Sequence, residues 1–215
     1  MFIAKLIPAR FFSLQARKPS GWFGRVVMSR IFNKGNADLN NFIKDLLDLQ
    51  ENDKVLEVGF GPGKLLNEIA SITTKGIAEG IDFSEAMYTE ASNINKNYIT
   101  NNRVKLQKGN CDDMPYENES FDKICTSNTI YFWDDPNKVV KEMFRVLKFR
   151  GKIVVGFRDK EQMRNLQLSD NVFNTYSLQD VSTLLSNAGF TDVCIEDREG
   201  EPFISYCAVA TKALQ

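Results

Sequence analysis

The chain has 215 residues and a formal net charge of −1, a balance that gives no overall reason to expect a nucleic-acid partner. A chain of this length suits one compact domain with an appendage. Histidine is absent, which excludes histidine-based triads and the commonest metal ligand and general base, and the four cysteines form no CxxC pair. We therefore predict a reduced, cytoplasmic protein with no metal site.

Basic residues are concentrated at the start of the chain. Residues 1–37 contain seven Lys or Arg and no Asp or Glu, whereas the remainder holds 20 basic and 28 acidic residues. No apolar run approaches the roughly 18–20 residues needed to span a bilayer. Lys5 and Arg10 interrupt the apolar stretch at the start, which argues against a signal peptide. An Arg-rich, acid-free start also resembles an organelle transit peptide, but residues 17–50 continue smoothly into a domain.

Helical and extended patterns alternate along the rest of the chain. Apolar residues at helical spacing predict helices over residues 38–50, 61–71, 84–98, 135–148 and 177–190. Short apolar runs predict strands over residues 55–60, 75–82, 103–110, 121–128 and 151–157, with a closing pair at 192–199 and 203–212. Strands that alternate with helices predict an α/β fold, with a largely parallel sheet covered by helices on both faces.

A glycine-rich turn, VLEVGFGPG at residues 55–63, joins the first strand to the next helix. Glycines let the backbone turn tightly and approach a ligand beside the amide groups of a helix N-terminus. The spacing is GxGxG, and Lys64 stands where the dinucleotide fingerprint GxGxxG places its third glycine. No Walker GKS or GKT sequence follows, and no Tyr-x-x-x-Lys pair is present. By itself the turn indicates either a nucleotide-like ligand or simply a tight strand–helix connection.

Four motifs follow one another along the chain: VLEVGFGPG, GIDFSEAM, GNCDDMPYENESFD and EMFRVLKFRGKIVVGF. In this order they resemble the class I S-adenosylmethionine-dependent methyltransferases, in particular the small-molecule branch related to the ubiquinone and menaquinone biosynthesis methyltransferases. The resemblance covers about residues 38–210. It implies a methyltransferase domain over residues 38–215 and S-adenosylmethionine as cofactor. It also implies a Rossmann-like, seven-stranded, mostly parallel sheet of order 3-2-1-4-5-7-6, with the seventh strand antiparallel.

The same resemblance implies a set of cofactor-binding residues. Glu57 would lie near the methionine amino group, and Asp82 would accept hydrogen bonds from both ribose hydroxyls, a role that suits a carboxylate. Asn110 stands where the family often has Asp, and its amide oxygen can still accept from the adenine. The complete set is Glu57, Gly59, Phe60, Gly61, Asp82, Phe83, Met87, Asn110, Cys111, Asp112 and Asn128. Asp82 could instead cap a helix, and Phe83 and Met87 could be ordinary core residues.

Three aromatic residues are candidates for the acceptor side of the site. Tyr131 and Trp133 follow the fourth strand, and Tyr176 precedes a late helix in the usual acceptor region. They could pack a small-molecule substrate or shield a sulfonium ion, or they could be hydrophobic packing beneath a loop. Methyl transfer needs a base only if the acceptor arrives protonated. Tyr131 and Tyr176 are candidates for that role, and the sequence assigns it to neither.

The basic residues 1–37 suggest a separate functional role for the start of the chain. Residues 16–40, ARKPSGWFGRVVMSRIFNKGNADLN, resemble the leading segment of one group of uncharacterised methyltransferases, in which a flexible N-terminal element covers the active site. Trp22 and Phe23 contribute to an apolar side, and Arg25 to a positive one. We predict that residues 1–37 form a lid over an anionic acceptor or a cap docked on an acidic body. Contact with an anionic membrane surface is a third role, which the sequence leaves open but does not favour.

We interpret the chain as a methyltransferase for a small-molecule acceptor that is anionic or lipid-like. The alternative is a non-catalytic protein that binds S-adenosylmethionine through the same fold. A nicotinamide-dependent dehydrogenase is a distant third. A nucleic-acid methyltransferase is disfavoured, because SNTIYFW stands after the fourth strand in place of an NPPY or DPPY tetrad. The sequence does not indicate an oligomeric state.

Overall fold

The computed structural model describes residues 8–166, 172–200 and 203–214. This part of the chain forms a seven-stranded sheet of order β3-β2-β1-β4-β5-β7-β6, so the predicted α/β fold and strand order are confirmed. Strand β7 runs antiparallel to both of its neighbours, and the other pairings are parallel. The strands are β1 (Lys54–Val58), β2 (Ile77–Asp82), β3 (Val104–Lys108), β4 (Phe121–Ser127), β5 (Leu147–Phe157), β6 (Thr191–Arg198) and β7 (Ser205–Thr211).

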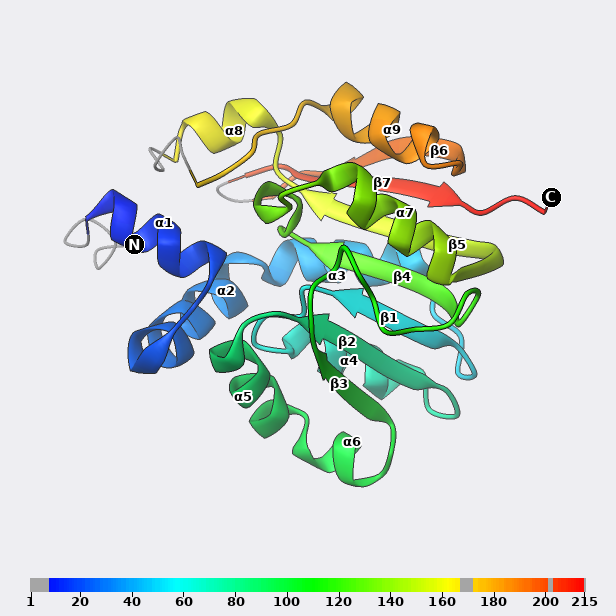
Figure 1. Cartoon of the computed structure of the whole chain (residues 1–215), viewed down its shortest axis with the longest axis horizontal. Helices are drawn as coiled ribbons and strands as arrows, with labels where there is room; N and C mark the ends of the chain where they lie inside the picture. Colours follow the sequence, from blue (N-terminus) through cyan, green and yellow to red (C-terminus); the bar gives the residue numbers. More distant parts are fainter. Residues whose placement is uncertain (1–7, 167–171, 201–202, 215) are drawn as a thin grey trace.

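Helices cover both faces of the sheet (Figure 1). Leu56 and Val58 of β1 belong to a core shared with α7 (Pro136–Val146) and α9 (Leu178–Asn187). Val55 belongs to a second core, which is formed with α3 (Ala37–Leu47) and α4 (Lys64–Ile72). Successive residues of a strand face opposite sides of the sheet, so one short apolar strand supplies both cores.

Several predicted boundaries differ from the structure by a few residues, and hydrogen bonds between distant segments explain two of the differences. The helix predicted over residues 84–98 divides at Asn95 into α5 (Glu85–Ile94) and α6 (Lys96–Thr100). The Asn95 side chain donates to the carbonyl oxygens of Gly63 and Ala91, each at 2.9 Å, and such side-chain bonds compete with helical backbone pairing. Helix α7 ends at Val146, not at residue 148, and β5 starts directly at Leu147, because the Ser120 amide binds the Val146 carbonyl.

The described part of the basic segment is helical. It contains α1 (Ala9–Arg17), a π-helix (Phe23–Met28) and α2 (Ser29–Gly35). These helices lie beyond the edge at which the parallel strands end (Figure 1). Two short helices lie on the chain after β4 and β5: a 3-10 turn (Ile130–Phe132) and α8 (Lys160–Arg164). Among the described residues, no helix is long and apolar enough to cross a bilayer.

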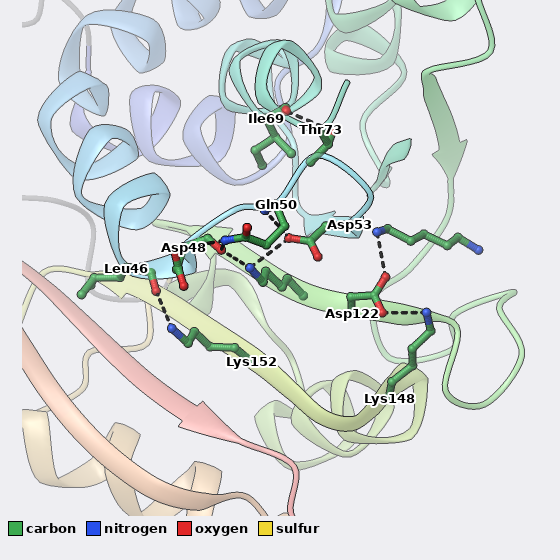
Figure 2. Close-up of polar contacts among 11 residues, drawn as sticks. Leu46, Asp48, Gln50, Asp53, Ile69, Thr73, Asp122, Lys148 and Lys152 are labelled. Carbon is green, nitrogen blue, oxygen red and sulfur yellow. Dashed lines mark hydrogen bonds and ion pairs between the residues drawn. The ribbon is translucent and has the colours of Figure 1, made fainter. Parts of the chain in front are cut away.

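Polar contacts hold the opposite edge, where β1, β4 and β5 begin (Figure 2). Asp122 accepts hydrogen bonds from the Lys54 amide at 2.8 Å and from the Lys148 ammonium at 2.7 Å. Asp53 lies 2.9 Å from the Lys123 ammonium. These contacts tie the start of β1 to β4, and Asp122 ties β4 to β5, so the strand register is fixed at the end remote from the loops that follow the strands.

Replacing Asp122 therefore tests stability separately from ligand binding. We expect Asp122→Ala to lower the free energy of unfolding by about 1–3 kcal/mol, because the Lys54 amide and the Lys148 ammonium lose a charged acceptor. Asp122→Asn keeps an acceptor for the amide and should lose less. Urea unfolding measures both variants. An unchanged midpoint for Asp122→Ala would contradict the structural role given to this residue.

Candidate functional site

The glycine-rich turn after β1 has an unusual backbone. Gly59, Gly61 and Gly63 have φ angles of 73°, 51° and 80°, in the left-handed region that favours glycine. A Cβ atom at Gly63 would lie 2.7 Å from the Ala91 side chain, so this glycine lets the turn pack on α5. A Cβ atom at Gly61 would meet no described atom within 4 Å. The turn is therefore closed on the α5 side and open at Gly61.

Asp82, at the end of β2, holds this turn in place. Its Oδ2 accepts the Gly61 amide at 2.9 Å, and its Oδ1 accepts the Ser84 amide at 2.8 Å. Burial raises the pKa of Asp82 to about 6, and the amides of Ser84, Gly61 and Phe83 partly oppose the rise. Ser84, not Asp82, caps α5 through its side chain. A carboxylate has about four acceptor sites, so Asp82 can still accept a hydrogen bond from a ligand hydroxyl.

Glu57 lies beneath the turn and is only 3% exposed. Its Oε2 is buried and has no hydrogen-bond partner among the described residues. Burial raises the pKa of Glu57 well above its ordinary value, and the nearby Asp82 carboxylate adds to the rise. Buried carboxylate oxygens are nearly always hydrogen-bonded, so an unpaired one indicates a donor that the described part of the chain does not supply. The site therefore offers an acceptor to a cationic or hydrogen-bonding group from outside the chain.

The other predicted cofactor residues surround this cradle unevenly. Phe83 is partly exposed at 38%, whereas Phe60 and Met87 are buried. Asn110 and Asp112 are exposed on the loop after β3. Burial, followed by the Asp112 charge, raises the pKa of Cys111 to about 12, so its thiol is no nucleophile near neutral pH. Of the predicted cofactor residues, Glu57, Gly61 and Asp82 lie close together. Met87 is buried in the protein interior.

Asn128 and Tyr131 are brought together after β4. Asn128 has a φ of 55°, its amide nitrogen donates to Asn36 Oδ1 at 3.0 Å, and its oxygen accepts the Tyr131 hydroxyl at 3.1 Å. The Tyr131 hydroxyl also accepts the Arg158 amide. Burial raises the pKa of Tyr131 above its ordinary value, so the phenol stays protonated. Tyr131 thus fixes the loop by hydrogen bonds.

A pocket of about 320 Å³ lies beside Tyr131. Phe132 and Phe173 form one wall, with ring centroids 5.0 Å apart, and Arg17 and Asp134 form an ion pair at another. The complete lining is Arg17, Tyr131, Phe132, Asp134, Val172, Phe173 and Asn174. Polar atoms therefore dominate the surface of the pocket, and Phe132, Phe173 and the paired Arg17 contribute to its wall.

The remaining predicted acceptor and lid residues lie elsewhere. Trp133 is 4% exposed and belongs to the large core, which Tyr176 also contacts. Trp22 is 67% exposed, and Arg25 is exposed beside it. Phe23 packs against Phe11, with ring centroids 5.2 Å apart. These placements favour the core alternative for Trp133 and put Trp22 and Arg25 on the outer side of the basic segment.

The basic segment is tied to the site at four points. The Ser84 hydroxyl donates to the Pro19 carbonyl at 2.8 Å, Asn36 binds Asn128, and Arg17 pairs with Asp134. Arg158, at the end of β5, also donates to the Gly35 carbonyl at 3.1 Å.

Sequence reasoning missed several of these groups: Asn36, Ser84, Phe132, Arg158 and Phe173. Phe132 could have been found, because it stands between two aromatic candidates. Backbone acceptors such as the carbonyl of Pro19 carry no residue-type signal. No group of three or more His, Cys, Asp or Glu residues that could hold a metal ion occurs within residues 8–166, 172–200 and 203–214.

Comparisons with known proteins agree with this geometry. A family model described as "Methyltransferase domain" matches residues 49–193. The chain is 29% identical over 177 residues to the uncharacterised methyltransferase YdaC of Bacillus subtilis. This alignment covers 82% of this chain and 93% of the relative. It is 33% identical over 105 residues to the ubiquinone/menaquinone biosynthesis C-methyltransferase UbiE of Geotalea daltonii, covering 48% of this chain and 45% of that one.

The fold also matches a solved structure. A methyltransferase in complex with the Haloferax volcanii Trm112 methyltransferase activator superposes with a TM-score of 0.77 at 16% identity, covering 89% of this chain and 96% of that one. At this identity the match shows the fold alone.

Gly61 and Gly63 form a matched pair for testing the cradle. Gly61→Ala should destabilise the fold by about 1–2 kcal/mol through its left-handed backbone and weaken S-adenosylhomocysteine binding at least about tenfold, because its Cβ fills the open side. Gly63→Ala adds a clash with Ala91 and should destabilise the fold by about 1–3 kcal/mol more. Urea unfolding and calorimetry separate the two effects. Unchanged affinity for Gly61→Ala would refute the cradle.

The raised pKa of Asp82 predicts how ligand affinity depends on pH. Ribose hydroxyls need the ionised carboxylate, and the pKa of Asp82 in the free protein is about 6. Affinity for S-adenosylhomocysteine should therefore be full above pH 7 and fall about tenfold by pH 5, where roughly one carboxylate in ten is ionised. Glu57 titrates beside it, so Asp82→Asn is the control. The variant should bind weakly with a flatter profile, and an unaltered wild-type profile in the variant would exclude Asp82.

Proposed function

The chain belongs to the family of methyltransferase domains, and from its site we propose that it methylates a small amphipathic acceptor, with an anionic end and an apolar body. The division into a lid over residues 1–37 and a methyltransferase domain over residues 38–215 is part of the proposal. The observation that carries it is the pocket beside Tyr131, in which aromatic rings and the Arg17 guanidinium face the same space.

The residues around the glycine turn fit S-adenosylmethionine. When bound, this cofactor supplies an electrophilic methyl group on a positively charged sulfur. The ribose hydroxyls would bind Asp82, the free Oε2 of Glu57 would accept from the methionine amino group or a water bound to it, and the open backbone at Gly61 leaves room for close approach. Two carboxylates in one cradle also suit a ligand that carries positive charge.

The acceptor side lies at the end of β4. Asn128 is held between Asn36 and Tyr131, so a side chain from the basic segment helps to orient the residue nearest the predicted methionine end. Phe132 and Phe173 can bury an apolar body, and Arg17 can pair with an anionic group. The closed basic segment keeps water from the site, which favours alignment of the reacting atoms.

Proton removal is assigned to no side chain. Tyr131 remains protonated, and Tyr176 contacts the core, where burial also raises its pKa. An acceptor that enters as an anion needs no base, and Arg17 stabilises that form. The relative whose name assigns it to C-methylation in ubiquinone and menaquinone biosynthesis supports a small-molecule acceptor.

The direct test measures S-adenosylhomocysteine release by the full chain. A panel of phenolic acids and fatty acids is compared with their neutral alcohols or esters. The proposal expects turnover with anionic amphipathic members and slower turnover with the neutral analogues. Binding of S-adenosylmethionine without turnover on any member would favour the non-catalytic alternative.

Arg17 and Asp134 separate substrate recognition from lid closure. If Arg17 binds an anionic acceptor, Arg17→Gln should raise KM about tenfold through loss of a charge-assisted hydrogen bond. Asp134→Asn should leave KM unchanged or lower it, because the guanidinium is freed for the acceptor. Steady-state kinetics with the best panel member checks this. Equal increases in KM for both variants would mean that the pair only latches the lid, and the anionic acceptor would be rejected.

A further inference from the structure

The outer side of the basic segment exposes large apolar side chains. Phe11 and Leu14 of α1 are 43% and 51% exposed, and Trp22 is 67% exposed. Phe11 and Leu14 are three residues apart on one helix face. The Phe11 ring contacts Phe23, the residue after Trp22, so these side chains come from two elements that pack together. Phe83 adjoins them, with the Lys18 ammonium 5.5 Å from its ring centroid. Exposed aromatic residues gathered in this way indicate a contact surface.

The same segment exposes positive charge. Arg10, Lys18, Arg25 and Arg30 are exposed, and none of them forms an ion pair with a residue that the structure describes. Arg17 is the member of this segment that does pair, with Asp134. Residues 38–215 carry a net acidic charge, with 28 acidic and 20 basic residues. The molecule is thus polarised, and its positive side also carries Phe11, Leu14 and Trp22.

A bilayer with anionic headgroups fits both features at once. Trp and Phe side chains settle at the boundary between headgroups and acyl chains, and basic residues beside them are attracted to anionic lipid. Each Lys or Arg near such a surface strengthens partitioning about fivefold, and the acidic body orients the molecule with its positive side toward the membrane. Basic residues alone would fit any anionic partner, whereas the exposed apolar side chains beside them also require an apolar region, which a bilayer provides.

We propose that Phe11, Leu14, Trp22, Arg10, Lys18, Arg25 and Arg30 form a docking surface for anionic lipid bilayers. The inner side of the same segment holds Arg17 at the pocket wall and Pro19 against Ser84. Docking therefore brings the pocket close to the membrane, where an amphipathic acceptor is concentrated. Acceptor entry from the bilayer rests on the proposed function, whereas docking does not.

The test uses the full chain without cofactor or acceptor. Vesicles of phosphatidylcholine with a quarter phosphatidylglycerol are compared with pure phosphatidylcholine by sedimentation. Binding is expected to the anionic vesicles and should be lost near 0.5 M salt, where screening is strong. Trp22 emission should shift to the blue and be quenched by brominated lipid. Trp22→Phe leaves buried Trp133 as the reporter, and its emission should not respond.

Matched variants assign the binding to this surface. Replacing Arg10, Lys18, Arg25 and Arg30 by Gln should weaken partitioning by about 600-fold, at about fivefold for each charge removed. Replacing Lys96, Lys105, Lys138 and Lys141 by Gln removes the same charge from exposed positions on the body and should have a much smaller effect. Leu14→Ser should weaken partitioning, and Ile94→Ser, at a 37% exposed position of α5, is its control. Circular dichroism confirms that each variant is folded.

The proposal is overturned if anionic vesicles do not bind the chain, or if the two sets of charge variants weaken binding equally. It is also overturned if Trp22 emission is unaffected when the protein sediments with vesicles, because docking would then use another surface. Turnover of a dissolved acceptor is measured in parallel. Its presence with no vesicle binding would reject docking alone, and its absence with vesicle binding would reject the proposed function alone.

Discussion

The Asp82 carboxylate is the contact on which the site depends. It accepts the Gly61 amide from the turn after β1 and the Ser84 amide at the start of α5. A parallel sheet places these strand ends side by side, and the two hydrogen bonds convert that proximity into a fixed cradle. Burial makes the ionised form costly, which is why the pKa of Asp82 rises to about 6. The fold thus keeps an incompletely compensated carboxylate where a ligand can complete its hydrogen bonding.

Glu57 is a second buried carboxyl group with incomplete hydrogen bonding. Its buried oxygen has no partner among residues 8–166, 172–200 and 203–214, and the Asp82 charge raises its pKa further. Two neighbouring acids in one enclosed space disfavour double ionisation in the free protein. A ligand with an ammonium group and a positive sulfur would relieve this repulsion on binding. The free protein therefore disfavours ionisation of both acids, and the positive charges of S-adenosylmethionine would favour it.

The N-terminal segment has two different surfaces, one that contacts the body of the protein and one that is exposed. Pro19 and Asn36 make polar contacts with the body, and Gly24 packs so closely on Pro19 that a Cβ atom there would lie 2.6 Å from the Pro19 backbone. Its outer surface keeps charge and exposed aromatic residues. The lid and lipid-contact hypotheses that the sequence left open are therefore compatible, because they concern opposite sides of one segment.

Much of the fold could be predicted, because strand alternation is local and the strand order followed from the ordered motifs. The motifs also contain Glu57, Gly61 and Asp82, the residues proposed for the cofactor side, and the structure brings these three close together. The failures involve distant contacts. Asn95 divides a helix because it reaches Gly63, and β5 begins early because Ser120 binds Val146. Neither partner can be identified from the local pattern of apolar residues.

The acceptor side shows why the remaining prediction was incomplete. The 3-10 turn ends at Phe132, and Trp133 after it is extended, so neighbouring aromatic residues separate: Tyr131 and Trp133 are buried in the core while the Phe132 ring contacts Phe173. Asn174 fixes this arrangement by donating its amides to the Tyr131 and Trp133 carbonyls, at 2.9 and 3.0 Å. The far wall of the pocket thus comes from a segment with no motif of its own. Under the proposed function, changes at Val172 or Phe173 would alter the acceptor without touching Asp82 or the glycine turn, so the cofactor motifs would not encode which molecule is methylated.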